Sequence, residues 1–175
     1  FAVDQGDSSS VPQFVSGFPV DVGIFKNASS SDNWVLSTRN ATGRFYNPNT
    51  SGTGGAHSVY NFDYPNGWLG TSTGTSWYSY MWRRAYKYMD AVTFLGNGSS
   101  SNIINHYLGV SPELLIIKKL NQSSYAGWAV YFGDSANLVL NSPEIKGHWY
   151  SNAVTSVSST TFTVGNNTDV NDSGD

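Results

Sequence analysis

Two acidic residues stand at related points of the sequence and could form a catalytic carboxylate pair. Asp21 and Glu113 each follow a proline closely and precede an apolar stretch that ends in a lysine, Lys26 or Lys118. Paired carboxylates hydrolyse glycosides, and a lysine in a dry pocket can act as a nucleophile. Because both copies keep the same acid and lysine, we interpret the acids as structural. Each would cap a turn or pair with its lysine, whose ammonium lies in water at a strand end.

Other kinds of catalytic or metal chemistry find little support. The three histidines, His57, His106 and His148, lack the spacing of metal ligands. The chain has no cysteine, which excludes disulfides and thiolate chemistry. Phosphate-binding, dinucleotide-binding and nucleophile-elbow motifs are also missing from the sequence. We therefore expect no enzyme activity, no cofactor and no bound metal. The oxygen-rich residues 166–175 leave calcium binding open beside simple Asx-turn chemistry.

Aromatic residues near polar ones are the better binding candidates. Such side chains can stack on a sugar ring and hydrogen-bond its hydroxyls. Two loops supply them, and the candidates are His57, Tyr60, Asp63, Tyr64, His148, Trp149 and Tyr150. The alternative is that these rings pack under their own loops or against a neighbouring subunit. Trp34 and Trp128 recur in register and are predicted to be core anchors.

An internal repeat organises the chain. Residues 17–26 read like residues 109–118, an offset of 92, and both begin with a glycine turn and continue into an apolar strand. Farther on, Trp34 matches Trp128 and Trp68 matches Phe162, both at an offset of 94. A period of this length suits small β domains in tandem rather than a solenoid. We predict two related units, residues 1–88 and residues 89–175.

The composition favours an all-β chain. Hydrophobic residues make up 39% of the 175 residues, aromatic residues 15% and charged residues only 12%. Ser and Asn supply about a quarter of the chain, and both favour turns over helices. The net charge of −3 argues against a broad nucleic-acid-binding surface. The longest apolar run, residues 114–117, is too short to insert into a membrane.

We expect antiparallel strands that form two sandwich-like units. In the first unit they are predicted near 13–16, 20–26, 33–37, 44–46, 67–70 and 75–83. In the second they are predicted near 91–95, 103–107, 113–120, 127–132, 137–141 and 160–165. Gly174 corresponds to Gly74, which precedes the aromatic strand 75–83, so the second unit lacks its closing strand. The sequence therefore reads as a window from a longer chain.

The second copy resembles a β domain of marine phage structural proteins, found in tail fibres and other virion-surface appendages and sometimes described as SPRY-like. The resemblance is carried by residues 91–98, residues 108–119, the strand 128–131, the strand 138–141 and the turn 170–174. The first copy resembles a neighbouring form through residues 17–27 and Trp34. The long Gly-rich loop 47–66 departs from the pattern. The resemblance implies no catalytic residues.

The resemblance implies a non-enzymatic virion structural protein that takes part in host-surface attachment. It also implies a virion-surface location. The implied partners are further copies of the same chain, most simply in a homotrimer, and other virion proteins. A host-surface glycan is the expected partner, whereas nucleic acid and membrane insertion are not expected. The alternative is a secreted or cell-surface bacterial carbohydrate-binding or adhesion module. A third possibility, a surface glycosidase, lacks a convincing acid pair. Seven Asn-x-Ser/Thr sequons occur and would be bare in a phage protein made in bacteria.

Overall fold

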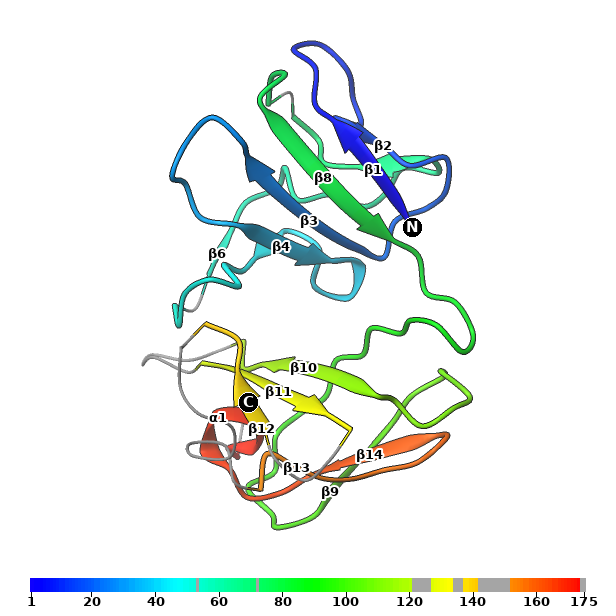
Figure 1. Ribbon diagram of the computed structural model, residues 1–175, viewed down its shortest axis with the longest axis vertical. Coiled ribbons are helices and arrows are strands. Elements are labelled where there is room, and N and C mark those ends of the chain that lie inside the picture. The colour runs from blue at the N-terminus through cyan, green and yellow to red at the C-terminus, as the bar shows by residue number, and fades with distance from the viewer. Residues whose placement is uncertain (53, 72, 121–126, 134–136, 142–151, 174–175) are drawn as a thin grey trace. The chain divides into compact units, whose positions relative to one another are not determined.

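The structure is a computed structural model that describes all residues except 53, 72, 121–126, 134–136, 142–151 and 174–175. The chain divides into two compact units. Unit 1 comprises Phe1–Pro48 and Gly54–Arg84, and unit 2 comprises Asn49–Thr53 and Ala85–Asp175. Their regular secondary structure consists almost wholly of antiparallel strands (Figure 1), which confirms the predicted all-β, sandwich-like class. No helix in the described part of the chain is long and apolar enough to cross a membrane.

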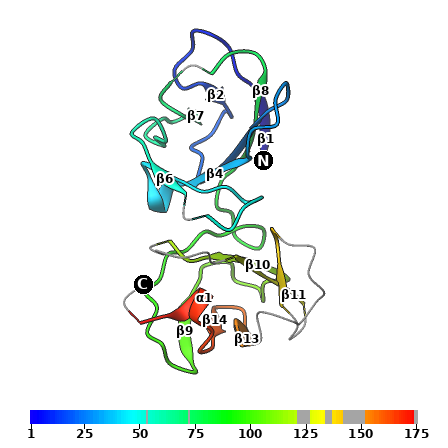
Figure 2. The same cartoon turned by 90° about the vertical axis from the view of Figure 1, so that its left-hand side faces the viewer.

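Unit 1 is organised around a four-stranded antiparallel sheet in the order β1-β8-β3-β4. These strands are Ala2–Gln5, Trp77–Trp82, Val22–Asn27 and Val35–Thr38. Two short pairs complete the unit. Strand β2 (Phe14–Val15) pairs with β7 (Gly67–Trp68), and β5 (Arg44–Phe45) pairs with β6 (Gly55–Ala56). A short 3-10 helix, Arg39–Ala41, follows β4. Figure 2 shows β2 and β7 as a layer beside the larger sheet.

The core of unit 1 lies between these layers. Trp68 from β7 is fully buried, contacts Phe25 edge-on and stacks on Phe62. Its indole Nε1–H donates to the hydroxyl of Ser79, 2.9 Å away, so the polar edge of the ring is satisfied within the core. Gly23 lies under the same ring. A β-carbon at Gly23 would approach within 2.3 Å of a ring carbon of Trp68, and only glycine fits there.

The described part of unit 2 contains two three-stranded sheets. The first has the order β10-β11-β12, with strands Leu114–Lys118, Trp128–Phe132 and Asn137–Val139. The second has the order β13-β14-β9, with strands Val154–Val157, Thr161–Val164 and Asn102–Asn105. Helix α1, Thr168–Asn171, follows β14. Apolar residues of the two sheets form one core that includes Ile117, Tyr131, Val154 and Phe162.

The sequence-predicted strand at 91–95 is wrong. Within the described residues of unit 2, this segment joins no ladder. Its counterpart in unit 1 is β1, which is a strand because Ala2 to Gln5 pair with Met81 to Tyr78 of β8. A strand depends on a pairing partner as well as on its own residues, and no described strand of unit 2 takes the place of β8. The sequence also did not predict β6, β13 or α1.

Candidate functional site

The outer face of the four-stranded sheet in unit 1 carries a group of aromatic rings. Side chains alternate between the two faces of a strand. In β8, Trp77, Ser79 and Met81 point to the core, and the intervening residues lie on the opposite face. Neighbouring strands add to that face, which we call the aromatic face. It comprises Phe1, Val3, Ile24, Trp34, Leu36, Tyr78, Tyr80 and Trp82.

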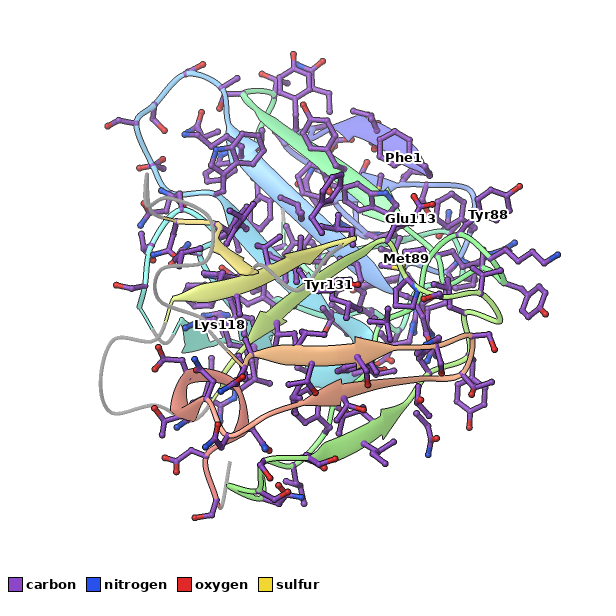
Figure 3. The ribbon with its side chains drawn as sticks, turned by 60° about the horizontal axis from the view of Figure 1, so that its bottom comes forward. Phe1, Tyr88, Met89, Glu113, Lys118 and Tyr131 are labelled. Atoms are coloured by element: carbon purple, nitrogen blue, oxygen red, sulfur yellow. The ribbon has the colours of Figure 1, made fainter. Side chains whose placement is uncertain are left out.

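The rings of the aromatic face contact one another and remain accessible to solvent. Phe1 packs on Trp82 with ring centroids 5.1 Å apart, and Trp34 packs on Tyr80 with centroids 6.2 Å apart. Phe1 is 70% exposed, while Trp34 and Tyr78 are each 37% exposed. Phe1, labelled in Figure 3, precedes strand β1. A row of partly exposed rings on a sheet offers a flat surface for stacking.

Polar groups at one end of the aromatic face hold its backbone and loops in place. Lys26, opposite Tyr78 in the ladder, donates its ammonium hydrogens to the carbonyls of Ser30 and Asp32 at 2.8 and 2.6 Å. The side-chain amide of Asn47 donates to the Trp34 carbonyl at 2.7 Å. These bonds fix the loop that presents the Trp34 ring. Lys26 is therefore not the ion-pair partner of Asp21 that the repeat suggested.

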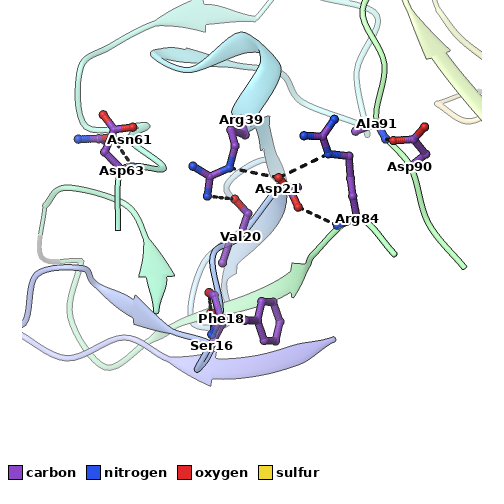
Figure 4. A network of polar contacts seen from close by, with 10 residues as sticks. All are labelled: Ser16, Phe18, Val20, Asp21, Arg39, Asn61, Asp63, Arg84, Asp90 and Ala91. Atoms are coloured by element: carbon purple, nitrogen blue, oxygen red, sulfur yellow. Dashed lines mark hydrogen bonds and ion pairs between the residues drawn. The ribbon is translucent and has the colours of Figure 1, made fainter. Parts of the chain in front are cut away.

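Asp21 instead organises the start of β3 (Figure 4). Its carboxylate accepts from Arg39 Nε at 3.1 Å and from the backbone N–H of Arg84 at 2.7 Å. Arg84 Nε lies 3.7 Å from the same carboxylate, and Arg39 also donates to the Val20 carbonyl at 2.6 Å. The carboxylate thus fastens the end of β8 beside β3. This supports the structural interpretation of Asp21 over a catalytic one.

Glu113 and Lys118, the counterparts in unit 2, lie at the two ends of β10 (Figure 3). Glu113 is exposed and forms no ion pair among the described residues. Lys118 places its ammonium 6.0 Å from the Trp128 ring centroid, and burial lowers the pKa of Lys118. The expected pairing of Glu113 with Lys118 is therefore wrong as well.

The loop that was predicted to bind through its aromatic residues turns them partly inward. Tyr60 is half-buried against Phe45, with centroids 4.9 Å apart, and burial raises its pKa. His57 and Asp63 are exposed, and Tyr64 is half-buried. In the loop 57–64, the exposed candidates are therefore the two non-aromatic polar ones, His57 and Asp63. His148, Trp149 and Tyr150 lie outside the described residues.

The two repeated tryptophans have different surroundings, and the prediction that both are core anchors is wrong for Trp34. Trp128 is buried, and its indole N–H donates to the Thr50 carbonyl at 3.1 Å. Trp34 belongs to the aromatic face. Sequence reasoning missed this face, although the alternation of Tyr78, Tyr80 and Trp82 was a usable signal.

The oxygen-rich turn after β14 is held by Asn171. Its buried side-chain nitrogen donates to the carbonyls of Gly165 and Ser99 at 2.8 and 2.9 Å, and its oxygen accepts from the backbone of Asn97 at 3.0 Å. Asn167 caps helix α1 by accepting from the backbone N–H of Asp169. The side-chain amides of Asn167 and Asn171 are thus occupied by protein hydrogen bonds, as Asx-turn chemistry predicts.

Comparison with known proteins gives one match. No curated protein and no solved structure matches the chain. Residues 66–175 match a domain of unknown function (DUF7483), a span that begins just before β7, includes β8 and continues through Ala85–Asp175 of unit 2. Because the matched span covers more than half of the sequence, the chain belongs to the DUF7483 family.

Proposed function

We propose that this chain is a non-enzymatic structural protein of a phage virion surface, part of a tail fibre or similar appendage, that contributes to host attachment. The sequence resemblance to phage β domains supports the virion location. The observation that carries the attachment role is the aromatic face of unit 1. Its exposed rings and low charge suit stacking on the apolar faces of sugars.

The aromatic face suits a neutral glycan better than a charged ligand. Its rings come from β8, from Phe1 before β1 and from Trp34 before β4, so the sheet ladder sets their spacing. Lys26 is a cation at its rim, and its ammonium is already directed to two loop carbonyls. Neutral sugars therefore require less desolvation here than anionic ones.

A glycan array followed by titration calorimetry tests the proposal. The purified chain is expected to bind a subset of neutral glycans, and Tyr78→Ala and Trp34→Ala are each expected to weaken binding at least about tenfold, which is about 1.4 kcal/mol. Tyr88→Ala is the matched control, since Tyr88 is an exposed ring of unit 2. Equal losses in all three variants, or no binding to any glycan, would contradict the attachment role.

The alternative is a secreted bacterial carbohydrate-binding module, for which the same aromatic face would serve. Light scattering on a size-exclusion column separates the two proposals. A stable homotrimer supports the fibre. A monomer that binds glycan through Tyr78 and Trp34 supports the bacterial module instead.

A further inference from the structure

The two units share one plan, strand by strand. In β3 and β4, Phe25 pairs with Val35, and in β10 and β11, Ile117 pairs with Ala129. These pairs are related by the repeat offsets of 92 and 94. The second layer repeats in the same way, since Phe14 pairs with Trp68 while Ile104 pairs with Phe162. All eight of these residues are buried.

The central strand of unit 1 has no described equivalent in unit 2. Strand β8 pairs with β1 along four residues and with β3 along six. Strand β10, the equivalent of β3, pairs with β11 and forms no other ladder among the described strands. Residues 92–95, the equivalent of β1, form none. A β8-like strand in unit 2 would lie between these two segments: β10, which is paired on one side by β11, and residues 92–95, which join no described ladder.

The side chains along β10 show the same difference. Val22 at the start of β3 is 8% exposed, whereas its counterpart Leu114 is 50% exposed. Ile116, the counterpart of the half-buried Ile24, is 47% exposed. Exposed apolar side chains on an unpaired strand edge form a template for another strand.

The last described residues of unit 2 lie beside the C-terminal end of β10. By analogy with unit 1, a β8-like strand would begin at this end. In unit 1, Asn27 at the end of β3 pairs with Trp77 at the start of β8. In unit 2, the equivalent of Asn27 is Lys119, whose ammonium lies 3.1 Å from the carboxylate of Asp172. The Gly98 N–H donates to the Asn171 carbonyl, and in unit 1 the related turns are joined by a bond in the opposite direction, from the Gly74 N–H to the Asp7 carbonyl.

We propose that the edge of β10 with which no described strand pairs accepts an antiparallel strand of the β8 type, supplied by polypeptide outside residues 1–175. The β3–β8 register defines its chemistry. The strand presents a small residue opposite Ile117, as Ser79 lies opposite Phe25, and a buried apolar residue opposite Leu115. It places aromatic residues opposite Leu114 and Ile116 and covers them. This is recognition by β-strand addition.

Hydrogen exchange on the whole chain tests this inference with a synthetic peptide of residues 74–83, the β8 sequence. The peptide is expected to slow exchange of the 114–118 amides at least about tenfold. The same peptide with Ser79→Pro is the matched control, because proline removes a ladder donor and leaves the protein unchanged. Ile116→Lys in the protein is expected to abolish the protection, whereas Ile103→Lys, at an exposed site on β9, is expected to keep it.

Three outcomes would overturn the inference. The 114–118 amides could exchange equally with and without peptide. The proline peptide could protect them as well as the β8 peptide does. Protection of β10 without peptide that disappears on dilution would show a second copy at the edge instead.

Discussion

The carboxylate of Asp21 holds the backbone N–H of Arg84 at 2.7 Å, and this bond joins the entry of β3 to the exit of β8. The residue is largely buried and also pairs with the Arg39 guanidinium. Replacing Asp21 with Asn weakens both charge-assisted contacts. We expect Asp21→Asn to lower the free energy of unfolding by about 1–3 kcal/mol in urea titrations.

Glu113 provides the matched control for Asp21, since it occupies the same repeat position but is exposed. Glu113→Gln is expected to change the free energy of unfolding by less than about 0.5 kcal/mol. Equal losses for the two variants would contradict the assignment of the loss to the contacts that Asp21 makes and Glu113 lacks.

Gly23 gives a second prediction. Its missing side chain leaves room for the buried Trp68 ring, which is fixed by its bond to Ser79. Gly23→Ala is expected to cost about 1–3 kcal/mol through overpacking. Gly52→Ala is the control, because the nearest atom to its added carbon is Thr50 Oγ1 at an ordinary 3.6 Å. Thermal unfolding followed by circular dichroism compares the two, and similar midpoints would refute the steric argument.

The repeat made much of the fold predictable from sequence. A glycine turn, a proline and an acid before an apolar strand located β3 and β10, and aligned aromatics located β7 and β14. The strands that were predicted wrongly or missed are those for which local sequence was not decisive. Residues 91–95 have strand-forming side chains but no described partner. The polar strand Val154–Val157 gave too weak an alternation to be recognised.

The candidate site was harder to predict than the fold. Aligning Trp34 with Trp128 identified equivalent positions but could not show what covers each ring. Trp128 is capped by the Thr50 carbonyl, a contact across 78 residues, while Trp34 packs on Tyr80 at the surface. In the loop 57–64 the sequence could not show that an aromatic ring is covered. This loop was expected to present its rings to a ligand, but its Phe62 stacks on Trp68 in the core.

Asn171 carries a third prediction. Its buried amide satisfies three backbone groups, the carbonyls of Gly165 and Ser99 and the N–H of Asn97. Asn171→Ala leaves those groups without a partner and is expected to lower the free energy of unfolding by about 1–3 kcal/mol. Asn166→Ala, five residues earlier and exposed, is expected to be nearly neutral. Hydrogen exchange should show the loss in residues 96–99, and an unchanged rate there would contradict the role of Asn171.

The last prediction concerns the acid side of the stability profile. The hydrogen bond and positive charge of Lys119 lower the pKa of Asp172. A carboxylate whose pKa is lower in the folded state stabilises the fold above its unfolded pKa, near 3.9, and that stabilisation is lost as pH falls through the folded value. Asp172→Asn is therefore expected to destabilise the protein at pH 7, and the difference from the parent should shrink below about pH 4. Urea titrations across this pH range measure the free energy of unfolding of both proteins. The control Asp63→Asn, at an exposed site without an ion pair among the described residues, should follow the parent curve. A constant difference between Asp172→Asn and the parent at every pH would show that the ion pair with Lys119 is not its source.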